Sequence, residues 1–279
     1  MTEREPLHTG TNDLIGWVED GVAVLSFNRP ERRNALSEAM YEGFDAALPV
    51  VAARSDIGCL VITGEGGAFC AGGDVKGFVE NNAAPRQAGG PSLEARIDGL
   101  RTRHNQVSLA IHNLPKVTIA AIPGATAGAG MSIALSCDLR VAAERCIITS
   151  AFSKIGASGD FGGSWFATQL LGPARAKQLY FLSERLTARD AERIGLVNQV
   201  LADDAFDAGW REMARAIAAG PTMAFRYIKE NIHRAGTGAD LATCLNAEAT
   251  AMVTTMSSAD HREAAAAFIE KRPAKFIGR

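Results

Sequence analysis

The feature that most constrains this fold is a stretch without charged side chains, residues 117–137. Its length is that of a membrane-spanning helix. The stretch also contains Pro123, Gly124, Gly128 and Gly130, which would interrupt such a helix. We therefore predict a buried strand, a glycine-rich turn and a buried helix, in that order, and we expect no membrane partner.

Strands and helices alternate along the first two thirds of the chain, and helices fill the last third. Strands are expected at 17–27 (with a turn at Gly21), 59–63, 117–122 and 139–142. Helices are expected at 37–53, 97–114, 130–136, 163–171, 173–182, 187–194, 203–219 and 223–235, and from about Asp240 and Asp260. The pattern indicates an α/β core over residues 1–202, with a loose leader at 1–15, and a helical region over residues 203–279. Residues 79–97 are rich in Asn, Ala, Pro and Gly, and we expect a mobile loop there.

Composition limits the partners and cofactors that this chain could use. The formal net charge is −2, so no overall basic field is available for nucleic acid. The five cysteines form no C-x-x-C pair, and no histidine has metal-ligand spacing to a second ligand. The N-terminal residues lack the apolar segment of a secretory signal. We therefore expect a cytoplasmic protein with reduced cysteines, no metal and no other bound cofactor.

Two glycine-rich turns each follow a short apolar strand. The first spans residues 69–74, and the second spans residues 128–130 and opens a helix. Small residues let backbone N–H groups approach a ligand closely, and a helix N-terminus carries a partial positive charge. If the two turns converge, their N–H groups could stabilise a negatively charged oxygen. Each turn alone could equally serve only to connect a strand to the next element.

The order and spacing of several motifs resemble those of the crotonase (enoyl-CoA hydratase/isomerase) family. The motifs are NRPERRNAL, ITGEGGAFCAGGD, AGAGMSIALSCDLRVA, IGASGDFGGSWFATQLLG, LTARDAERIGLVNQVL and REAAAAFIEKRPAKFIGR. The resemblance implies a crotonase-like spiral of ββα units with a helical C-terminal trimerisation region. It also implies a homotrimer or a dimer of trimers. The implied substrate is an acyl-CoA thioester, with coenzyme A present only as part of that substrate.

The same resemblance implies roles for the two turns. The backbone N–H groups of Gly73 and Ala129 would form an oxyanion hole for a thioester enolate. Arg32 and Arg33 stand where the family holds the CoA nucleotide, although an ordinary solvated pair of arginines explains them nearly as well. Asp74 is expected to hold its loop rather than to act on the substrate. The full substrate-binding set that we expect is Arg32, Arg33, Ala71, Gly72, Asp74, Gly128, Ser132, Phe152 and Trp165.

Two positions depart from the hydratases of this family. Those enzymes use two glutamates to position a water molecule and to protonate the substrate, and here Ser132 and Phe152 stand at these positions. Neither side chain titrates near pH 7, so classical hydration is in doubt. One acid remains nearby, Asp160, at a position where several isomerases of the family carry an aspartate. A single carboxylate suffices to move a proton along an acyl chain.

The surroundings of Asp160 decide between two roles. Apolar neighbours such as Phe152, Phe161 and Trp165 would raise the pKa of the carboxyl group and make it a better base. The alternative role is a cap for the helix that begins at Gly162 or Gly163.

Within the family, the segments AFSKIG, GDFGGSWF, LLGPARA and FIGR most resemble the 1,2-epoxyphenylacetyl-CoA isomerase branch of phenylacetate degradation, although Gly159 replaces the usual proline. We therefore expect an acyl-CoA isomerase. Two alternatives remain open: an enoyl-CoA hydratase with non-standard acids, and a non-catalytic acyl-CoA-binding protein.

Overall fold

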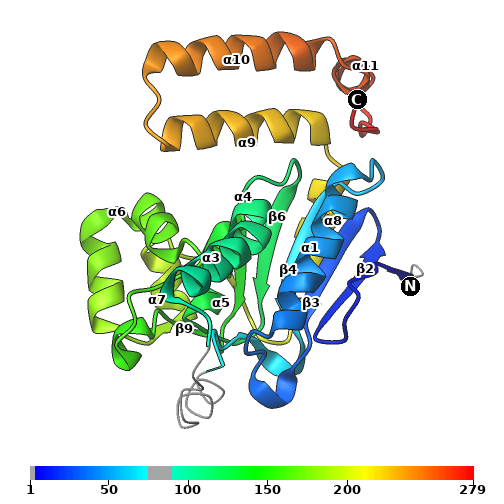
Figure 1. The fold of residues 1–279 in the computed structure, drawn as a ribbon. Helices are drawn as coiled ribbons and strands as arrows, with labels where there is room; N and C mark the ends of the chain where they lie inside the picture. Colours follow the sequence, from blue (N-terminus) through cyan, green and yellow to red (C-terminus); the bar gives the residue numbers. More distant parts are fainter. Residues whose placement is uncertain (1–3, 75–89) are drawn as a thin grey trace.

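A seven-stranded sheet forms the centre of the fold in the computed structural model, which describes residues 4–74 and 90–279 (Figure 1). The strands follow the order β1-β2-β3-β4-β6-β8-β11. Their bounds are β1 Glu5–Pro6, β2 Leu14–Glu19, β3 Val22–Phe27, β4 Cys59–Gly64, β6 Val117–Ile122, β8 Leu139–Ala143 and β11 Gln199–Leu201. The strands from β3 to β11 run parallel, whereas β1, β2 and β3 pair antiparallel. The central strands are continuously apolar because helices cover both faces of the sheet.

A second sheet of four short strands stands beyond the ends of the first. Its order is β10-β9-β7-β5, with β5 Ala68–Cys70, β7 Ala125–Ala127, β9 Ile147–Thr149 and β10 Leu186–Thr187. The strands β5, β7 and β9 directly follow β4, β6 and β8 along the chain. Each long strand therefore leads into a short strand and then a helix, which is the expected repeat of ββα units.

Helices cover the large sheet on both faces. The helices that precede α9 in the chain are α1 Glu38–Ala53, α3 Leu93–His104, α4 Ala110–His112, α5 Ala129–Ser136, α6 Gly163–Leu182, α7 Ala188–Arg193 and α8 Phe206–Ala218. Ser37 caps α1, as the sequence predicts, because its side chain accepts a hydrogen bond from the N–H of Met40. Phe44 of α1 lies in the core of one face, and Trp210 of α8 lies in the core of the opposite face. Thus α8 packs with the core, although the sequence places it in the C-terminal helical region.

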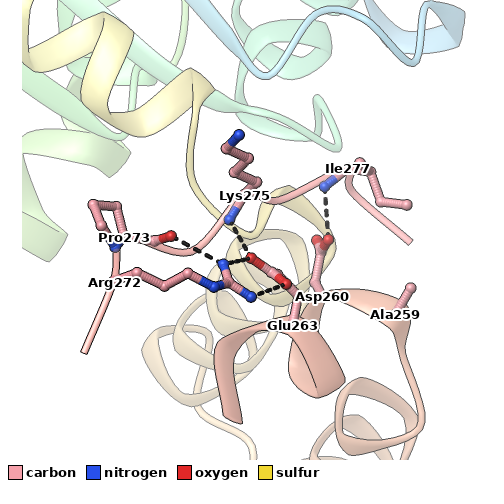
Figure 2. Close-up of a pocket in the computed structure, with 7 residues that line it drawn as sticks. All are labelled: Ala259, Asp260, Glu263, Arg272, Pro273, Lys275 and Ile277. Carbon is pink, nitrogen blue, oxygen red and sulfur yellow. Dashed lines mark hydrogen bonds and ion pairs between the residues drawn. The ribbon is translucent and has the colours of Figure 1, made fainter. Parts of the chain in front are cut away.

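The remaining helices, α9 Thr222–Gly236, α10 Leu241–Met256 and α11 Ala259–Glu270, stand apart from the sheet (Figure 1). Lys229 of α9 anchors this region, because its ammonium group lies 2.8 Å from the Asp138 carboxylate, which also accepts hydrogen bonds from Thr118. Figure 2 shows how the C-terminal tail folds back onto α11 around a hollow of about 720 Å³. There the Asp260 carboxylate accepts a hydrogen bond from the N–H of Ile277. The residues that line this hollow, between 259 and 277, are far in the sequence from both glycine-rich turns and from Asp160.

Two segments differ from the sequence-based expectation. Ser92 caps α3, so the helix begins at Leu93 and residues 93–97 are helical rather than part of a mobile loop. The earlier part of that expected loop, residues 79–89, lies outside the described residues. The expected loose leader is also partly ordered, because β1 pairs with β2 and the Leu7 side chain is buried. Within residues 4–74 and 90–279, no helix has the length and apolar character to cross a membrane.

Candidate active site

The structure brings the two glycine-rich turns into contact. Gly72 adopts a positive φ of 88°, a conformation that suits glycine alone. A methyl group added at Gly72 would stand 2.7 Å from the carbonyl oxygen of Ala127 and 3.2 Å from the backbone nitrogen of Ala129. Gly130 is equally close to the first turn, since a methyl group there would stand 2.3 Å from the carbonyl oxygen of Cys70. The convergence anticipated from the sequence is therefore present.

The segment that follows β3 holds the first turn in place. The Ala71 N–H donates to the Arg33 carbonyl at 3.0 Å, and the Leu36 N–H donates to the Gly72 carbonyl at 2.9 Å. The buried Asn34 side chain donates hydrogen bonds to backbone carbonyl groups that flank the turn. This explains why the NRPERRNAL motif precedes the glycine-rich turn: its backbone clamps the turn against the rest of the core.

The side chains around the first turn differ in exposure. Asp74 forms an ion pair with Arg29 at 3.9 Å, which fits a role in holding the loop. Arg32 and Arg33 are exposed, and within the described part of the chain neither forms an ion pair with a carboxylate. Their contact with the CoA nucleotide stays a prediction.

Two backbone N–H groups at the junction of the turns are available to a ligand. Ala129 is the first residue of α5, so its N–H has no partner within the helix. Across residues 4–74 and 90–279, neither this N–H nor that of Gly73 donates to a protein acceptor. Ala129 is almost fully buried. A buried donor without a partner is costly, so an incoming oxygen atom would satisfy it.

Asp160 lies in the loop that leads into α6, and its carboxyl group is poorly solvated. One carboxyl oxygen, Oδ1, is buried and has no hydrogen-bond partner among the described residues. Burial raises the pKa of Asp160 to about 6. The helix-cap alternative is wrong, because the cap residue of α6 is Gly162 and, among the described residues, no side chain accepts a capping hydrogen bond from this helix. The carboxyl group of Asp160 therefore does not cap α6.

Aromatic rings surround the residue that follows Asp160. Phe161 is fully buried and adopts a positive φ of 49°, which is unusual for a side chain of this size. Its ring packs against Tyr41 at 5.8 Å and against His104 at 4.8 Å between ring centroids. The Phe161 N–H donates to Nε2 of His104 at 3.1 Å. These contacts fix the backbone on the C-terminal side of Asp160.

Phe152 connects the loop of Asp160 to the second turn. Its ring stacks on Tyr180 at 5.8 Å. A methyl group at Gly128 would stand 3.7 Å from the Phe152 ring, and one at Gly159 would stand 2.8 Å from the Tyr180 ring. Phe152 and Tyr180 therefore form an apolar wall between Gly128 and Gly159, the residue before Asp160. Tyr180 is a site residue that the sequence does not signal, because it lies near the end of a long helix and far along the chain from both turns.

Ser132 is fully buried and cannot act as an acid or a base near neutral pH. Its hydroxyl donates to the carbonyl of Gly128 at 3.4 Å. A methyl group at Gly163 would stand 2.2 Å from Oγ of Ser132 and 2.4 Å from the Tyr180 hydroxyl oxygen. Burial raises the pKa of Tyr180 to about 12, so this group also stays protonated. Among the described residues at the two turns, Asp74 is paired with Arg29, so Asp160 is the carboxylic acid with a buried oxygen that has no hydrogen-bond partner.

Trp165 is the one expected site residue whose described contacts lie elsewhere. Its ring is 42% exposed and packs edge-on against His112 and Phe166. It lines a groove of about 470 Å³ between α6 and α9, together with Lys229 and His233. The apolar surroundings of Asp160 therefore come from Phe152, Phe161 and two tyrosines rather than from Trp165.

Comparison with known proteins agrees with this arrangement. A family model described as "Enoyl-CoA hydratase/isomerase" matches residues 18–279. A "Probable enoyl-CoA hydratase" from Rhodobacter capsulatus is 37% identical over 262 residues, which cover 94% of this chain and 96% of the relative. A "1,2-epoxyphenylacetyl-CoA isomerase" from Escherichia coli is 35% identical over 266 residues, which cover 95% of this chain and 98% of the relative.

A solved structure shows the same fold. The crystal structure of a putative enoyl-CoA hydratase from Streptomyces coelicolor superposes with a TM-score of 0.88 at 32% identity, covering 98% of this chain and 97% of that chain. The crotonase-like spiral predicted from the sequence is therefore confirmed.

Proposed function

Since this chain belongs to the enoyl-CoA hydratase/isomerase family, we propose that it is an acyl-CoA isomerase that works through a thioester enolate. The observation that carries the proposal is the buried carboxyl group of Asp160, whose pKa burial raises to about 6. A base with a pKa near the working pH is well matched to removing a weakly acidic carbon-bound proton. The two residues at the hydratase glutamate positions, Ser132 and Phe152, supply neither an acid nor a base.

The proposed reaction needs one base and one oxyanion hole. Asp160 removes a proton from the α-carbon of a 3-enoyl-CoA, and the electron pair moves onto the thioester oxygen. The N–H groups of Gly73 and Ala129 donate hydrogen bonds to this oxygen and stabilise its charge. Asp160 then returns the proton to the γ-carbon, so the double bond moves into conjugation with the reformed thioester carbonyl. No atom is gained or lost overall.

The acyl group is proposed to be aromatic or of similar width. The support is the flat wall formed by Phe152 and Tyr180, stacked at 5.8 Å between Gly128 and Gly159. Flat rings pack well against such a wall. The similarity to the E. coli isomerase, whose name specifies an epoxyphenylacetyl thioester, points to the same substrate class.

A hydratase is the second candidate, because the relative from R. capsulatus carries the name of a hydratase. In that case Asp160 would have to serve both to activate water and to protonate the substrate. Two separate groups usually perform these tasks, and the other described carboxylic acid at the turns, Asp74, is paired with Arg29. For this reason we rank hydration second.

The test is α-proton exchange in D₂O with 3-enoyl-CoA and arylacetyl-CoA thioesters, read by mass spectrometry. Wild type should incorporate deuterium and shift the double bond of the enoyl substrate. Asp160→Asn should lose the exchange, typically by about 10²-fold or more. Asp204→Asn, a change at an exposed aspartate in the turn before α8, is the matched control and should keep it.

Each other result selects an alternative. Full exchange in Asp160→Asn would remove Asp160 from the mechanism. Water addition to a 2-enoyl-CoA by wild type, without exchange in the 3-enoyl series, would select the hydratase. Binding of the thioesters with neither reaction would select a non-catalytic acyl-CoA-binding protein.

We also propose that the chain works in the cytoplasm as a homotrimer or a dimer of trimers. The support is the apolar surface that the C-terminal helices present to solvent. The exposed apolar side chains on these helices and the tail are Ile228, Ile232, Leu241, Leu245, Met252, Val253, Met256, Phe268, Ile269 and Ile277. A monomer rarely exposes so many large apolar side chains in one region, so contacts between copies of the chain would bury them.

A further inference from the structure

One contact at the candidate active site has no role in the proposed chemistry: the hydrogen bond from the Phe161 N–H to Nε2 of His104, at 3.1 Å. The donor belongs to the residue that directly follows Asp160. The hydrogen bond therefore fixes the orientation of the peptide group that joins Asp160 to Phe161. His104 comes from α3, a separate part of the chain, so it acts as a brace from outside the loop.

The braced backbone is in a conformation that needs support. Phe161 has a φ of 49°, in the left-handed region that bulky residues rarely occupy. Such a conformation is energetically unfavourable and persists where surrounding contacts hold it. The contacts here are the hydrogen bond to His104, the edge-on packing of the two rings at 4.8 Å, and the stacking of Tyr41 at 5.8 Å.

The helix geometry changes directly after this histidine. His104 is its last residue, and a π-helical turn over Asn105–Leu109 follows directly. Single π-turns within α-helices are found frequently at functional sites.

The hydrogen bond requires one protonation state of His104. Nε2 can accept a hydrogen bond from the Phe161 N–H only when the imidazole is neutral and carries its own proton on Nδ1. An imidazolium ion has two N–H donors and no acceptor, so protonation must break the bond. Partial burial favours the neutral ring and lowers the pKa of His104 below its ordinary value.

The charged and titratable groups around His104 do not compensate for protonation. Arg103, its neighbour on α3, lies over the ring of Tyr41 and pairs with Glu38 of α1 at 2.6 Å. Tyr41 itself stays protonated, because burial raises its pKa. Among the described residues, Asp160 on the loop is the remaining titratable group, and its buried Oδ1 has no hydrogen bond to the ring.

We propose that neutral His104 is a positioning residue that holds the Asp160–Phe161 peptide, so that Asp160 loses its productive orientation when His104 is protonated. This inference rests on the proposed role of Asp160 as the base. It adds a second group that must be deprotonated for turnover. A misplacement of about 1 Å at the base can cost about 10²-fold in rate, so the brace matters for kcat more than for KM.

The test compares His104→Gln and His104→Leu with wild type in the exchange assay across the pH range from about 4 to 8. The glutamine side chain can accept the same hydrogen bond through its amide oxygen at every pH, whereas leucine cannot accept at all. Below the two pKa values, log(kcat/KM) of wild type should approach a slope of 2 against pH, because two protons must leave. His104→Gln should keep most of the activity at pH 8. At low pH its log(kcat/KM) should approach a slope of 1 against pH, because one proton must leave. His104→Leu should lower kcat about 10-fold or more while KM changes little.

A second measurement keeps the inference testable if His104→Leu folds poorly. The ¹⁵N shifts of the His104 ring in wild type should identify the tautomer with its proton on Nδ1 at pH 8. The proposal fails if the proton is on Nε2, or if wild type and His104→Gln share a slope of 1. If Asp160→Asn abolishes exchange while both His104 variants match wild type, the brace is wrong and the proposed function stands. Full exchange in Asp160→Asn would instead overturn the proposed function.

Discussion

Replacing Asp160 by asparagine should make the protein more stable at pH 8 even as it removes the proposed base. Burial raises the pKa of Asp160 from its ordinary value of 3.8 to about 6. The folded chain therefore holds this proton more tightly than the unfolded chain does. The favourable contribution to stability is complete below about pH 4, and it is lost as the pH rises through 6, where the buried carboxyl group ionises.

The size of this effect follows from the same shift. At about 1.4 kcal/mol for each pH unit, the rise to about 6 corresponds to about 3 kcal/mol for a fully ionised group. Two effects reduce the gain from the substitution. The Asp160 residue keeps partial contact with solvent, and the asparagine amide is itself a polar group that burial leaves short of partners. We therefore expect the free energy of unfolding at pH 8 to rise by about 1–2 kcal/mol.

The assay is urea denaturation of wild type, Asp160→Asn and Asp204→Asn at one protein concentration, at pH 8 and at pH 4. A fixed concentration is needed because association of subunits would add to the apparent stability. The gain of Asp160→Asn should be present at pH 8 and small at pH 4, where the folded carboxyl group is neutral and the unfolded one is only partly ionised. An equal gain at both pH values, or no gain at pH 8, would show that ionised Asp160 is not desolvated, and the argument for it as the base would lose its physical ground.

Three further predictions concern the turns and the C-terminal helices. Gly72→Ala should lower turnover by about 10²-fold or more, because the methyl group would meet a carbonyl oxygen at 2.7 Å and displace the first turn; Gly67→Ala, also at a positive φ but with nothing within 4 Å, should keep activity in the same assay. Lys229→Met should destabilise the fold by about 3 kcal/mol in urea denaturation, because it leaves the carboxylate of Asp138 without its mostly buried cationic partner. Phe268→Asp, at a side chain that is 86% exposed, should leave the fold intact and shift the mass measured by light scattering towards monomer; an unchanged mass would mean that α11 lies outside the interface.

The long elements could be predicted because each carries its own signal. Ser37 caps α1, and the apolar runs at 59–63 and 117–122 form β4 and β6. The short strands of the second sheet could not be predicted, because β5, β7 and β9 have three residues each and are stabilised by pairing with one another. Three residues are too few to establish a period of alternation, so their existence depends on contacts that no local pattern records.

The candidate site divides in the same way. The two turns could be located because glycine marks backbone that approaches a ligand closely. The choice between cap and base for Asp160 needed the true start of α6, one residue beyond Gly162. Tyr180 and His104 carried no local signal, since each lies on a helix whose sequence is compatible with a purely structural role. Both reach the site through tertiary packing alone.

The backbone donors and the side-chain acids and bases of such a site can change independently of one another. The proposed oxyanion donors are backbone groups held by turn geometry, so side-chain replacement near them leaves the donors in place. The acid and base positions are side chains, and each can change independently of the donors. Here Ser132 is buried against Gly163 and Phe152 is buried against Gly128. Because packing occupies those two positions, one desolvated carboxyl group is left to carry the proton. A reaction that removes a proton from the substrate and returns a proton to the same substrate is the one that such a site can complete alone.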